Sequence, residues 1–142
     1  VQVSREKVSL LQILEQIRRY MLQTLLPSAR RVTIHVGGED VIVSADCASS
    51  VALVVNELVQ NALKYAFPSG QAGRIGIELH SGRPLCQLTV WDNGVGFQAD
   101  RPRPGGAGLE LASTIVREKL TGEWSVESGP GGTRISFDFL EQ

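Results

Sequence analysis

The sequence has few residues that could crosslink a fold, hold a structural metal or cross a membrane. Among its 142 residues the only cysteines are Cys47 and Cys86, which fit no metal-binding spacing and suggest no disulfide framework. We interpret both as small buried apolar residues in a reducing compartment and expect a cytoplasmic location. No run of about 18 apolar residues is present to span a bilayer, and no basic segment followed by an apolar one marks a signal peptide. We therefore expect no contact with a membrane.

An excess of charge of either sign is also lacking. The chain has 14 Lys and Arg residues against 15 Asp and Glu residues, a formal net charge of −1. This charge gives no general attraction to nucleic acid or to anionic membranes. Methionine occurs once, at Met21, and the chain begins at Val1. We interpret residues 1–142 as a single domain excised from a longer protein, with 42% hydrophobic residues available for a core.

The spacing of apolar residues predicts a mixed α/β fold. Helical periodicity predicts helices at about residues 10–25, 44–66 and 109–120. Alternation predicts strands at residues 31–36, 41–43, 75–79, 86–90, 124–127 and 133–139. The Gly37-Gly38 pair is expected to turn the first of these strands into the second. Three helices on one face of a mixed, largely antiparallel sheet would form a two-layer α/β sandwich.

Polar residues at two helix starts predict N-terminal caps. Ser9 with Gln12 three residues later forms a capping-box pattern for the first helix. Ser44 and Asp46 are both suitable N-caps for the second helix. The second helix should stop before Pro68, because the residue before a proline disfavours helix.

The second predicted helix carries a polar stripe beside its apolar face. Glu57, Asn61 and Lys64 lie at i, i+4 and i+7 and so share one side of the helix, followed by Tyr65. A carboxylate, a carboxamide and an ammonium in line could form the wall of a pocket for Mg²⁺ and phosphate. From these residues alone, the alternative is an amphipathic helix whose polar face is simply solvated.

A carboxylate and two glycines follow the fourth predicted strand. Asp92 could accept a hydrogen bond from the exocyclic amine of adenine and would meet the carbonyl of guanine as a second acceptor. Gly94 and Gly96 would let the backbone pass close to a nucleotide. The alternative is an ordinary Asp-Asn-Gly turn.

A second glycine cluster precedes the third predicted helix. Gly106 and Gly108, just before Leu109, could hold a phosphate against the amides at the start of that helix. Short glycine clusters also serve as turns, and this one is neither a P-loop nor a dinucleotide fingerprint. We interpret residues 94–108 as a mobile loop that leads into the helix.

Three segments, taken in order, resemble the N, G1 and G2 boxes of the ATP-binding domain of sensor histidine kinases. They are Asn-Glu-Leu-Val-Gln-Asn-Ala-Leu-Lys-Tyr-Ala (56–66), Asp-Asn-Gly-Val-Gly-Phe (92–97) and Gly-Gly-Ala-Gly-Leu (105–109). That domain belongs to an ATPase superfamily shared with gyrase, MutL-type and Hsp90-type proteins. The resemblance covers essentially the whole chain and implies the same Bergerat-type fold, with ATP and Mg²⁺ as cofactors.

The resemblance implies a role for each polar residue of the second helix. Asn61 would ligate Mg²⁺, and Glu57 would lie where a general base or a water-orienting carboxylate is proposed. Lys64 would approach the phosphates, and Tyr65 would lie near the adenine or the ribose.

Further roles are implied outside that helix. Asp92 would bind adenine, and Thr133 would form the pocket floor, reaching adenine directly or through water. Without the resemblance, Thr133 is equally a cross-strand threonine on a β-hairpin. The segment after Phe97 corresponds to the ATP lid, which is short here and lacks a second phenylalanine. Arg101 and Arg103 within it could touch the γ-phosphate or be solvated loop charges.

The sequence lacks a histidine in the setting where the resembled family carries its phosphoryl acceptor, a helical dimerisation segment. His35 and His80 each lie on the polar face of a predicted strand, and we interpret both as surface residues. The resemblance then implies that this chain binds Mg-ATP and donates the γ-phosphoryl group to a histidine on an adjoining dimerisation domain outside it. A response regulator would follow in the signalling pathway. The short lid and residues 115–122 favour a branch that often signals to RNA-binding antiterminator regulators.

Two other functions remain open at this point. An anti-sigma factor of the same superfamily would phosphorylate serine on a partner protein, and a histidine-bearing helical hairpin upstream would argue against it. A nucleotide-responsive interaction module would bind ATP and a partner without phosphotransfer. A gyrase-, MutL- or Hsp90-type ATPase is disfavoured, because the chain has little sequence for their larger lids and dimerisation arms.

Overall fold

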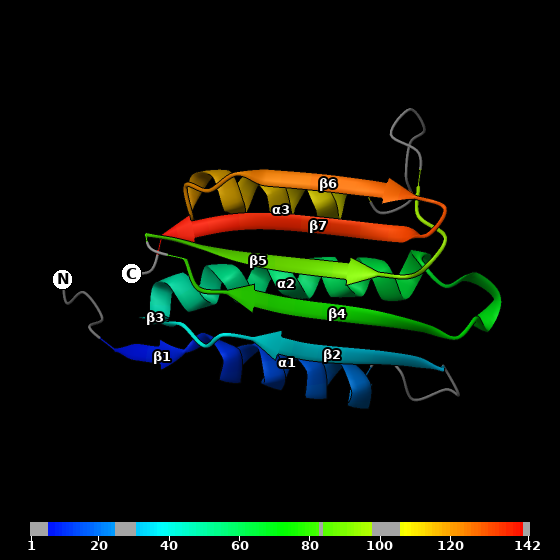
Figure 1. Cartoon of the computed structure of the whole chain (residues 1–142), viewed down its shortest axis with the longest axis horizontal. Helices are drawn as coiled ribbons and strands as arrows, with labels where there is room; N and C mark the ends of the chain where they lie inside the picture. Colours follow the sequence, from blue (N-terminus) through cyan, green and yellow to red (C-terminus); the bar gives the residue numbers. More distant parts are fainter. Residues whose placement is uncertain (1–5, 25–30, 83, 98–105, 141–142) are drawn as a thin grey trace.

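The computed structural model describes residues 6–24, 31–82, 84–97 and 106–140, which form two layers (Figure 1). The elements in chain order are β1 (Lys7–Ser9), α1 (Leu10–Thr24), β2 (Val32–Gly38), β3 (Ile42–Ser44), α2 (Ala45–Tyr65), the short 3₁₀ helix η1 (Pro68–Gly70), β4 (Gly73–His80), β5 (Leu85–Asp92), α3 (Gly106–Glu118), β6 (Trp124–Gly129) and β7 (Gly132–Leu140).

The main sheet of the described chain has five strands in the order β2-β4-β5-β7-β6. β2 pairs with β4 in parallel, and the other neighbouring strands pair antiparallel. The helices α1, α2 and α3 cover one face of this sheet (Figure 1). This arrangement confirms the predicted two-layer sandwich with a mixed, largely antiparallel sheet.

The strand register places consecutive residues on opposite sides of the sheet. One row crosses all five strands on the helix side, and its members are Ile34, Ile75, Asp92, Thr133 and Ser128. The adjacent row lies on the open side, and its members are His35, Gly76, Trp91, Arg134 and Glu127. Asp92 and Thr133 are buried, whereas Arg134 and Glu127 are exposed. The register therefore directs Asp92 and Thr133 together toward the helix layer.

The core lies between the sheet and α2. Val51, Val54, Val55 and Leu58 of α2 are at most 2% exposed, and burying each such side chain contributes about 1.5–3 kcal/mol. The helix begins after Ser44, whose Oγ accepts a hydrogen bond from the amide of Cys47 at 3.1 Å. Of the two predicted caps, Ser44 is therefore the N-cap, and Asp46 lies in the first turn.

The sulfur and imidazole side chains lie where the sequence predicts. Cys47 and Cys86 are buried free thiols, and burial raises the pKa of the Cys47 thiol, which keeps it unreactive. His35 and His80 are exposed. Among the described residues, no helix combines the length and the apolar character needed to cross a membrane.

The prediction that Gly37-Gly38 turns one strand into the next is wrong. β2 continues through both glycines alongside β4, and β3 pairs instead with β1, a strand that the periodicity did not predict. Gly38 has a φ of +110°, and a β-carbon there would lie 2.0 Å from the carbonyl oxygen of Leu79. The glycine thus permits a close approach to β4 and does not form a hairpin turn.

The predicted boundaries of the third helix are also wrong. α3 begins at Gly106 and ends at Glu118, so the second glycine cluster forms its first turn instead of a preceding loop. After the helix, Thr121 adopts a left-handed φ of 48°. Gly122 then passes so close to β7 that a β-carbon would meet the carbonyl oxygen of Asp138 at 1.7 Å.

Candidate functional site

The polar stripe of α2 lies against the first turn of α3. Asn61 is buried, with 6% of its surface exposed, and Glu57 is half-buried one turn earlier. A β-carbon on Gly108 would stand 2.8 Å from Oε2 of Glu57 and 3.8 Å from Nδ2 of Asn61. Because Gly108 has no side chain, the Glu57 carboxylate lies close against the amino-terminal turn of α3, with the Asn61 carboxamide nearby. Backbone amides at such a turn attract anions.

The remaining predicted residues of α2 lie at its carboxyl end. Lys64 is exposed in the last turn, and Tyr65 is the half-buried last residue of the helix. Lys64 forms no ion pair with another described residue. Its side chain is therefore exposed at the carboxyl end of α2.

Asp92 closes β5 with its carboxylate on the helix side. The side chain is 9% exposed, and its Oδ1 accepts a hydrogen bond from the amide of Gly94 at 2.9 Å. The next residue, Asn93, is joined to β4, since its Oδ1 accepts from the amide of Arg74 at 2.7 Å and its own amide donates to the Arg74 carbonyl at 3.2 Å. The segment is therefore held to a neighbouring strand and is more than a free Asp-Asn-Gly turn.

The segment 94–97 follows Asn93 and lies between α2 and the β6–β7 hairpin, where two of its glycines make close contacts. The amide of Val95 donates to the carbonyl of Ala66 at 2.9 Å, and a β-carbon on Gly94 would lie 2.2 Å from that same oxygen. Gly96 has a φ of +69°, and its β-carbon would lie 1.9 Å from the carbonyl oxygen of Gly129. Both contacts exclude a side chain, so Gly94 and Gly96 are required by the packing.

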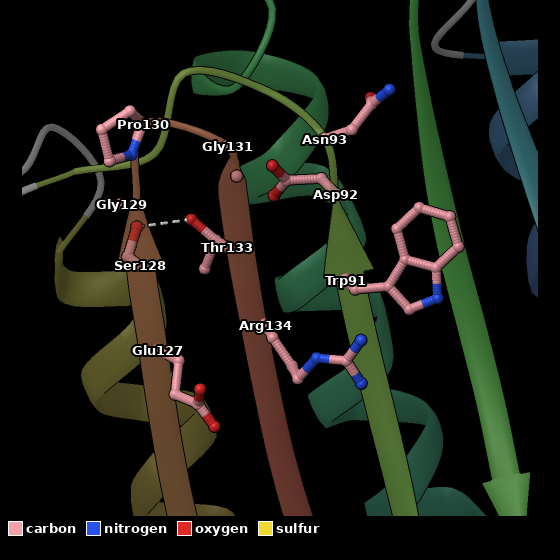
Figure 2. Close-up of a pocket in the computed structure, with 11 residues that line it drawn as sticks. Trp91, Asp92, Asn93, Glu127, Ser128, Gly129, Pro130, Gly131, Thr133 and Arg134 are labelled. Atoms are coloured by element: carbon pink, nitrogen blue, oxygen red, sulfur yellow. Dashed lines mark hydrogen bonds between the residues drawn. The ribbon is translucent and has the colours of Figure 1, made fainter.

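A pair of hydroxyl groups joins this segment to the sheet. Oγ of Ser128 lies 2.7 Å from Oγ1 of Thr133 (Figure 2), and it accepts a hydrogen bond from the amide of Phe97 at 2.8 Å. Thr133 is the directly opposed partner of Asp92 in the β5–β7 ladder. Sequence reasoning missed Ser128, although the pairing of Gly129 with Gly132 across the hairpin places Ser128 opposite Thr133.

A pocket of about 510 Å³ opens at the end of β5, β6 and β7 (Figure 2). Of the predicted site residues, Asp92 and Thr133 line it, whereas Glu57, Asn61 and Gly108 do not. Figure 2 shows the Asp92 carboxylate pointing toward β7 and away from the Trp91 ring. The predicted residues therefore lie in two groups, one between α2 and α3 and the other at the sheet end.

The α2–α3 group has the chemistry of a magnesium site. Mg²⁺ takes oxygen ligands and keeps several waters and substrate phosphates, so one or two protein oxygens suffice. Asn61 supplies a carboxamide oxygen, and the Glu57 carboxylate lies nearby against Gly108. Among the described residues, no cluster of three or more His, Cys, Asp or Glu side chains could hold a metal by itself. The residues therefore fit a magnesium ion that arrives with a nucleotide.

Other predicted residues take different positions or lie outside the described ranges. Gly106 opens α3. Leu109 is half-buried and lines a separate cavity of about 550 Å³ with Phe97, Trp124 and Val126. The lid segment 98–105, with Arg101 and Arg103, lies outside the residues that the structure describes.

Comparison with known sequences identifies a family. Residues 47–142 match the family model described as histidine kinase-, DNA gyrase B- and HSP90-like ATPase. The sensor histidine kinase PdtaS of Mycobacterium tuberculosis is 27% identical over 120 residues, covering 82% of this chain and 24% of PdtaS. Blue-light-activated histidine kinase 2 of Erythrobacter litoralis is 31% identical over 112 residues, covering 75% of this chain and 32% of that protein. This chain thus spans about a quarter to a third of the length of these kinases.

A similar protein of another kind is the serine-protein kinase RsbW of Listeria innocua. It is 28% identical over 89 residues, covering 51% of this chain and 57% of RsbW. The match is shorter on this chain than the matches to the sensor kinases.

Solved structures show the same fold. The histidine kinase domain of the Erythrobacter litoralis EL346 blue-light-activated kinase superposes with a TM-score of 0.83 at 24% identity, covering 99% of this chain and 65% of that chain. Histidine kinase ThkA, solved in complex with the response regulator protein TrrA, superposes with a TM-score of 0.77 at 19% identity, covering 96% of this chain and 42% of that chain. Because the family match runs from the first turn of α2 through the β6–β7 hairpin, the chain belongs to the histidine kinase-, DNA gyrase B- and HSP90-like ATPase family.

Proposed function

We propose that this chain binds Mg-ATP and donates its γ-phosphoryl group to a histidine on an adjoining dimerisation domain, as the first step of two-component signalling. The observation that carries the proposal is that the three segments on which the family resemblance rests lie in contact in the fold. The α3 start touches the polar stripe of α2 at Gly108 and Glu57, and the segment after Asp92 touches the end of α2 at Gly94 and Ala66. The names of the sensor histidine kinases similar to this chain support the same function.

Adenine recognition is assigned to the sheet end. The Asp92 carboxylate would accept the exocyclic amine of adenine, and it is already oriented by the amide of Gly94. A guanine carbonyl would meet this carboxylate as a second acceptor, and leaving two acceptors face to face disfavours binding. Thr133 forms the floor beside it, and Tyr65 at the end of α2 would border the adenine or the ribose.

Phosphate binding is assigned to the facing ends of α2 and α3. Asn61 would ligate the magnesium ion, which when bound neutralises phosphate charge. Gly106 and Gly108, in the first turn of α3, would let phosphate oxygens approach its amides, with Leu109 following. Lys64 would reach the phosphates from the end of α2. Glu57 would orient or deprotonate the attacking imidazole.

The acceptor and the downstream partner lie outside this chain in this proposal. His35 and His80 point to the open side of the sheet, away from the residues assigned to ATP. In this proposal neither histidine receives the phosphoryl group from ATP bound to the same chain. A response regulator is proposed as the next partner, supported by the solved complex of ThkA with TrrA.

Calorimetric titration with ATP and GTP, with and without Mg²⁺, tests the proposal. We expect magnesium-dependent ATP binding and no GTP binding. Asp92→Asn should weaken ATP binding about tenfold or more, because a hydrogen bond to a charged group is lost. Asn61→Ala should remove the dependence on magnesium. ATP binding that ignores both substitutions would contradict the assigned site.

The similarity to the serine kinase RsbW supports a second candidate, transfer to serine on a partner protein. The two products differ chemically, because a phosphoramidate on histidine hydrolyses in acid whereas a phosphoester on serine survives it. Acid treatment of the labelled product, formed when this chain is joined to or mixed with each proposed acceptor, therefore separates the candidates. ATP binding and partner binding without any transfer would instead indicate an interaction module.

A further inference from the structure

Three hydrogen-bonding groups form a chain that ends beside Asp92. The amide of Phe97 donates to Oγ of Ser128 at 2.8 Å, and Oγ of Ser128 lies 2.7 Å from Oγ1 of Thr133. Thr133 is 6% exposed and is paired with Asp92 across the β5–β7 ladder. The chain thus runs from the end of the segment after Asp92, through β6, to the floor of the pocket in Figure 2.

Hydrogen-bond chemistry fixes the direction of the first bond in this chain, whereas either hydroxyl can donate in the second. A backbone amide can only donate, so Ser128 is the acceptor toward Phe97. A hydroxyl has one proton, and Thr133 lies within reach of the Ser128 proton. When Ser128 donates to Thr133, the single proton of Thr133 is left to donate to a ligand. Hydrogen bonds in such a series also strengthen one another.

We propose that Ser128 is a positioning residue for nucleotide selection, which turns the proton of Thr133 toward a ring nitrogen of adenine. This inference rests on the proposed function and deepens it. Asp92 would accept the exocyclic amine, while Thr133 would donate to N1 or N7, the ring nitrogens on either side of that amine. Together they present one acceptor and one donor, which match adenine. With N1 as the acceptor, guanine is rejected at both groups because its N1 carries a proton. With N7, an acceptor that both bases share, guanine is rejected by Asp92 alone.

Ligand analogues that lack one ring nitrogen test the role of Ser128. In 1-deaza-ATP and 7-deaza-ATP a carbon replaces N1 or N7, so the Thr133 proton loses its acceptor in one of them. We expect the wild-type chain to bind that analogue about threefold to tenfold more weakly than ATP, the effect of one neutral hydrogen bond. Ser128→Ala should bind ATP and that analogue about equally. Calorimetric titration in the presence of Mg²⁺ measures each affinity.

Matched variants separate this role from a structural one. Ser125→Ala removes an exposed serine from the same strand and should keep the wild-type ratio. Ser128→Thr retains the hydroxyl and should also keep it. Thr133→Val should abolish discrimination, and combining it with Ser128→Ala should add nothing. Ser128→Cys, with a weak donor of similar size, gives the same comparison if the alanine variant does not fold.

Each outcome decides the inference. If Ser128→Ala weakens ATP and both analogues by one common factor, Ser128 acts only on the structure and the inference is wrong. It is also wrong if the wild-type chain binds ATP and both analogues equally. Absence of ATP binding by the wild-type chain would overturn the proposed function together with this inference, whereas normal ATP binding with an unchanged ratio in Ser128→Ala would overturn the inference alone.

Discussion

The Glu57 carboxylate lies 2.8 Å from the point where a β-carbon on Gly108 would stand. The first turn of α3 can therefore carry no side chain at this position unless Glu57 moves. Gly108→Ala should leave the free energy of unfolding within about 1 kcal/mol of wild type, because the better helix propensity of alanine offsets the displacement of a flexible side chain. Calorimetry should show Mg-ATP affinity reduced about tenfold, because the added methyl group crowds Glu57 and the first-turn amides proposed to bind phosphate.

A glycine in open space provides the control for this substitution. A β-carbon on Gly37 of β2 would meet no atom within 4 Å, and Gly37 does not line the pocket of Figure 2. Gly37→Ala should therefore leave the affinity for Mg-ATP close to that of wild type. Equal losses of affinity in Gly108→Ala and Gly37→Ala would indicate that the contact between Gly108 and Glu57 has no part in binding.

Replacing the proposed base separates chemistry from binding. Glu57→Gln keeps the shape of the side chain but removes its ability to take a proton. In a protein that joins this chain to its histidine-bearing domain, we expect phosphotransfer to fall by about 10²-fold or more, with ATP affinity changed less than threefold. Single-turnover transfer of labelled phosphate and calorimetry give the two quantities. A common loss in both would refute the assignment of Glu57 as the base.

The open side of the sheet offers a test of packing. Trp91 lies over Gly76, where a β-carbon would be 2.1 Å from Cε2 of the indole. Gly76→Ala should destabilise the fold by about 1–3 kcal/mol, because the ring must leave its position. Gly37→Ala on the neighbouring strand, with no atom within 4 Å, should change stability by much less. Urea unfolding followed by circular dichroism compares them, and similar losses would show that Trp91 does not restrict this position.

Stability toward acid should depend on Asp40. Burial raises the pKa of Asp40, but hydrogen bonds from the hydroxyl of Ser9 and the amides of Leu11 and Val41 lower it more, so the pKa lies below its ordinary value. A lowered folded-state pKa stabilises the fold above the unfolded-state pKa, and this contribution is lost as the pH falls through the folded-state pKa. Asp40→Asn should therefore be less stable than wild type at neutral pH, with the difference shrinking in acid.

Urea titrations at several pH values below the ordinary pKa of aspartate measure this difference. Glu15→Gln provides a comparison, because a hydrogen bond from Arg18 lowers the pKa of the Glu15 carboxyl in the same direction. Glu15 and Arg18 are three residues apart on one helix face, so we expect a smaller effect there. A stability difference for Asp40→Asn that stays constant with pH would contradict the prediction.

Periodicity predicted most elements because one side of each faces the core. Alternation in β5 and β7 and the helical spacing in α2 place apolar residues on the buried side, and the elements appear within a few residues of the predicted ranges. Glycine is ambiguous in such patterns, since it allows both a turn and a close approach. Gly38 serves close approach to Leu79, and this depends on β4, more than thirty residues away.

Long-range contacts also explain what the sequence did not reveal at the start of α1 and at the candidate site. The predicted capping-box serine, Ser9, accepts from the amide of Gln12 as expected. The same helix start also needs the carboxylate of Asp40, 29 residues from Leu11. Ser128 acquires its partners only when the hairpin sets its register and the segment ending at Phe97 folds over it. Such contacts have no local sequence signal.

Trp91 and Asp92 are adjacent on β5, so the fluorescence of Trp91 can report events at Asp92. Asp92 faces the proposed nucleotide, while the half-buried indole of Trp91 faces the opposite side and lies near Glu78. One peptide unit joins the two residues, so a shift of the strand end on ligand binding changes the polarity around the indole. Intrinsic emission, to which Trp124 also contributes, can then follow ATP binding without a dye, because Trp91 and Asp92 line the same pocket (Figure 2).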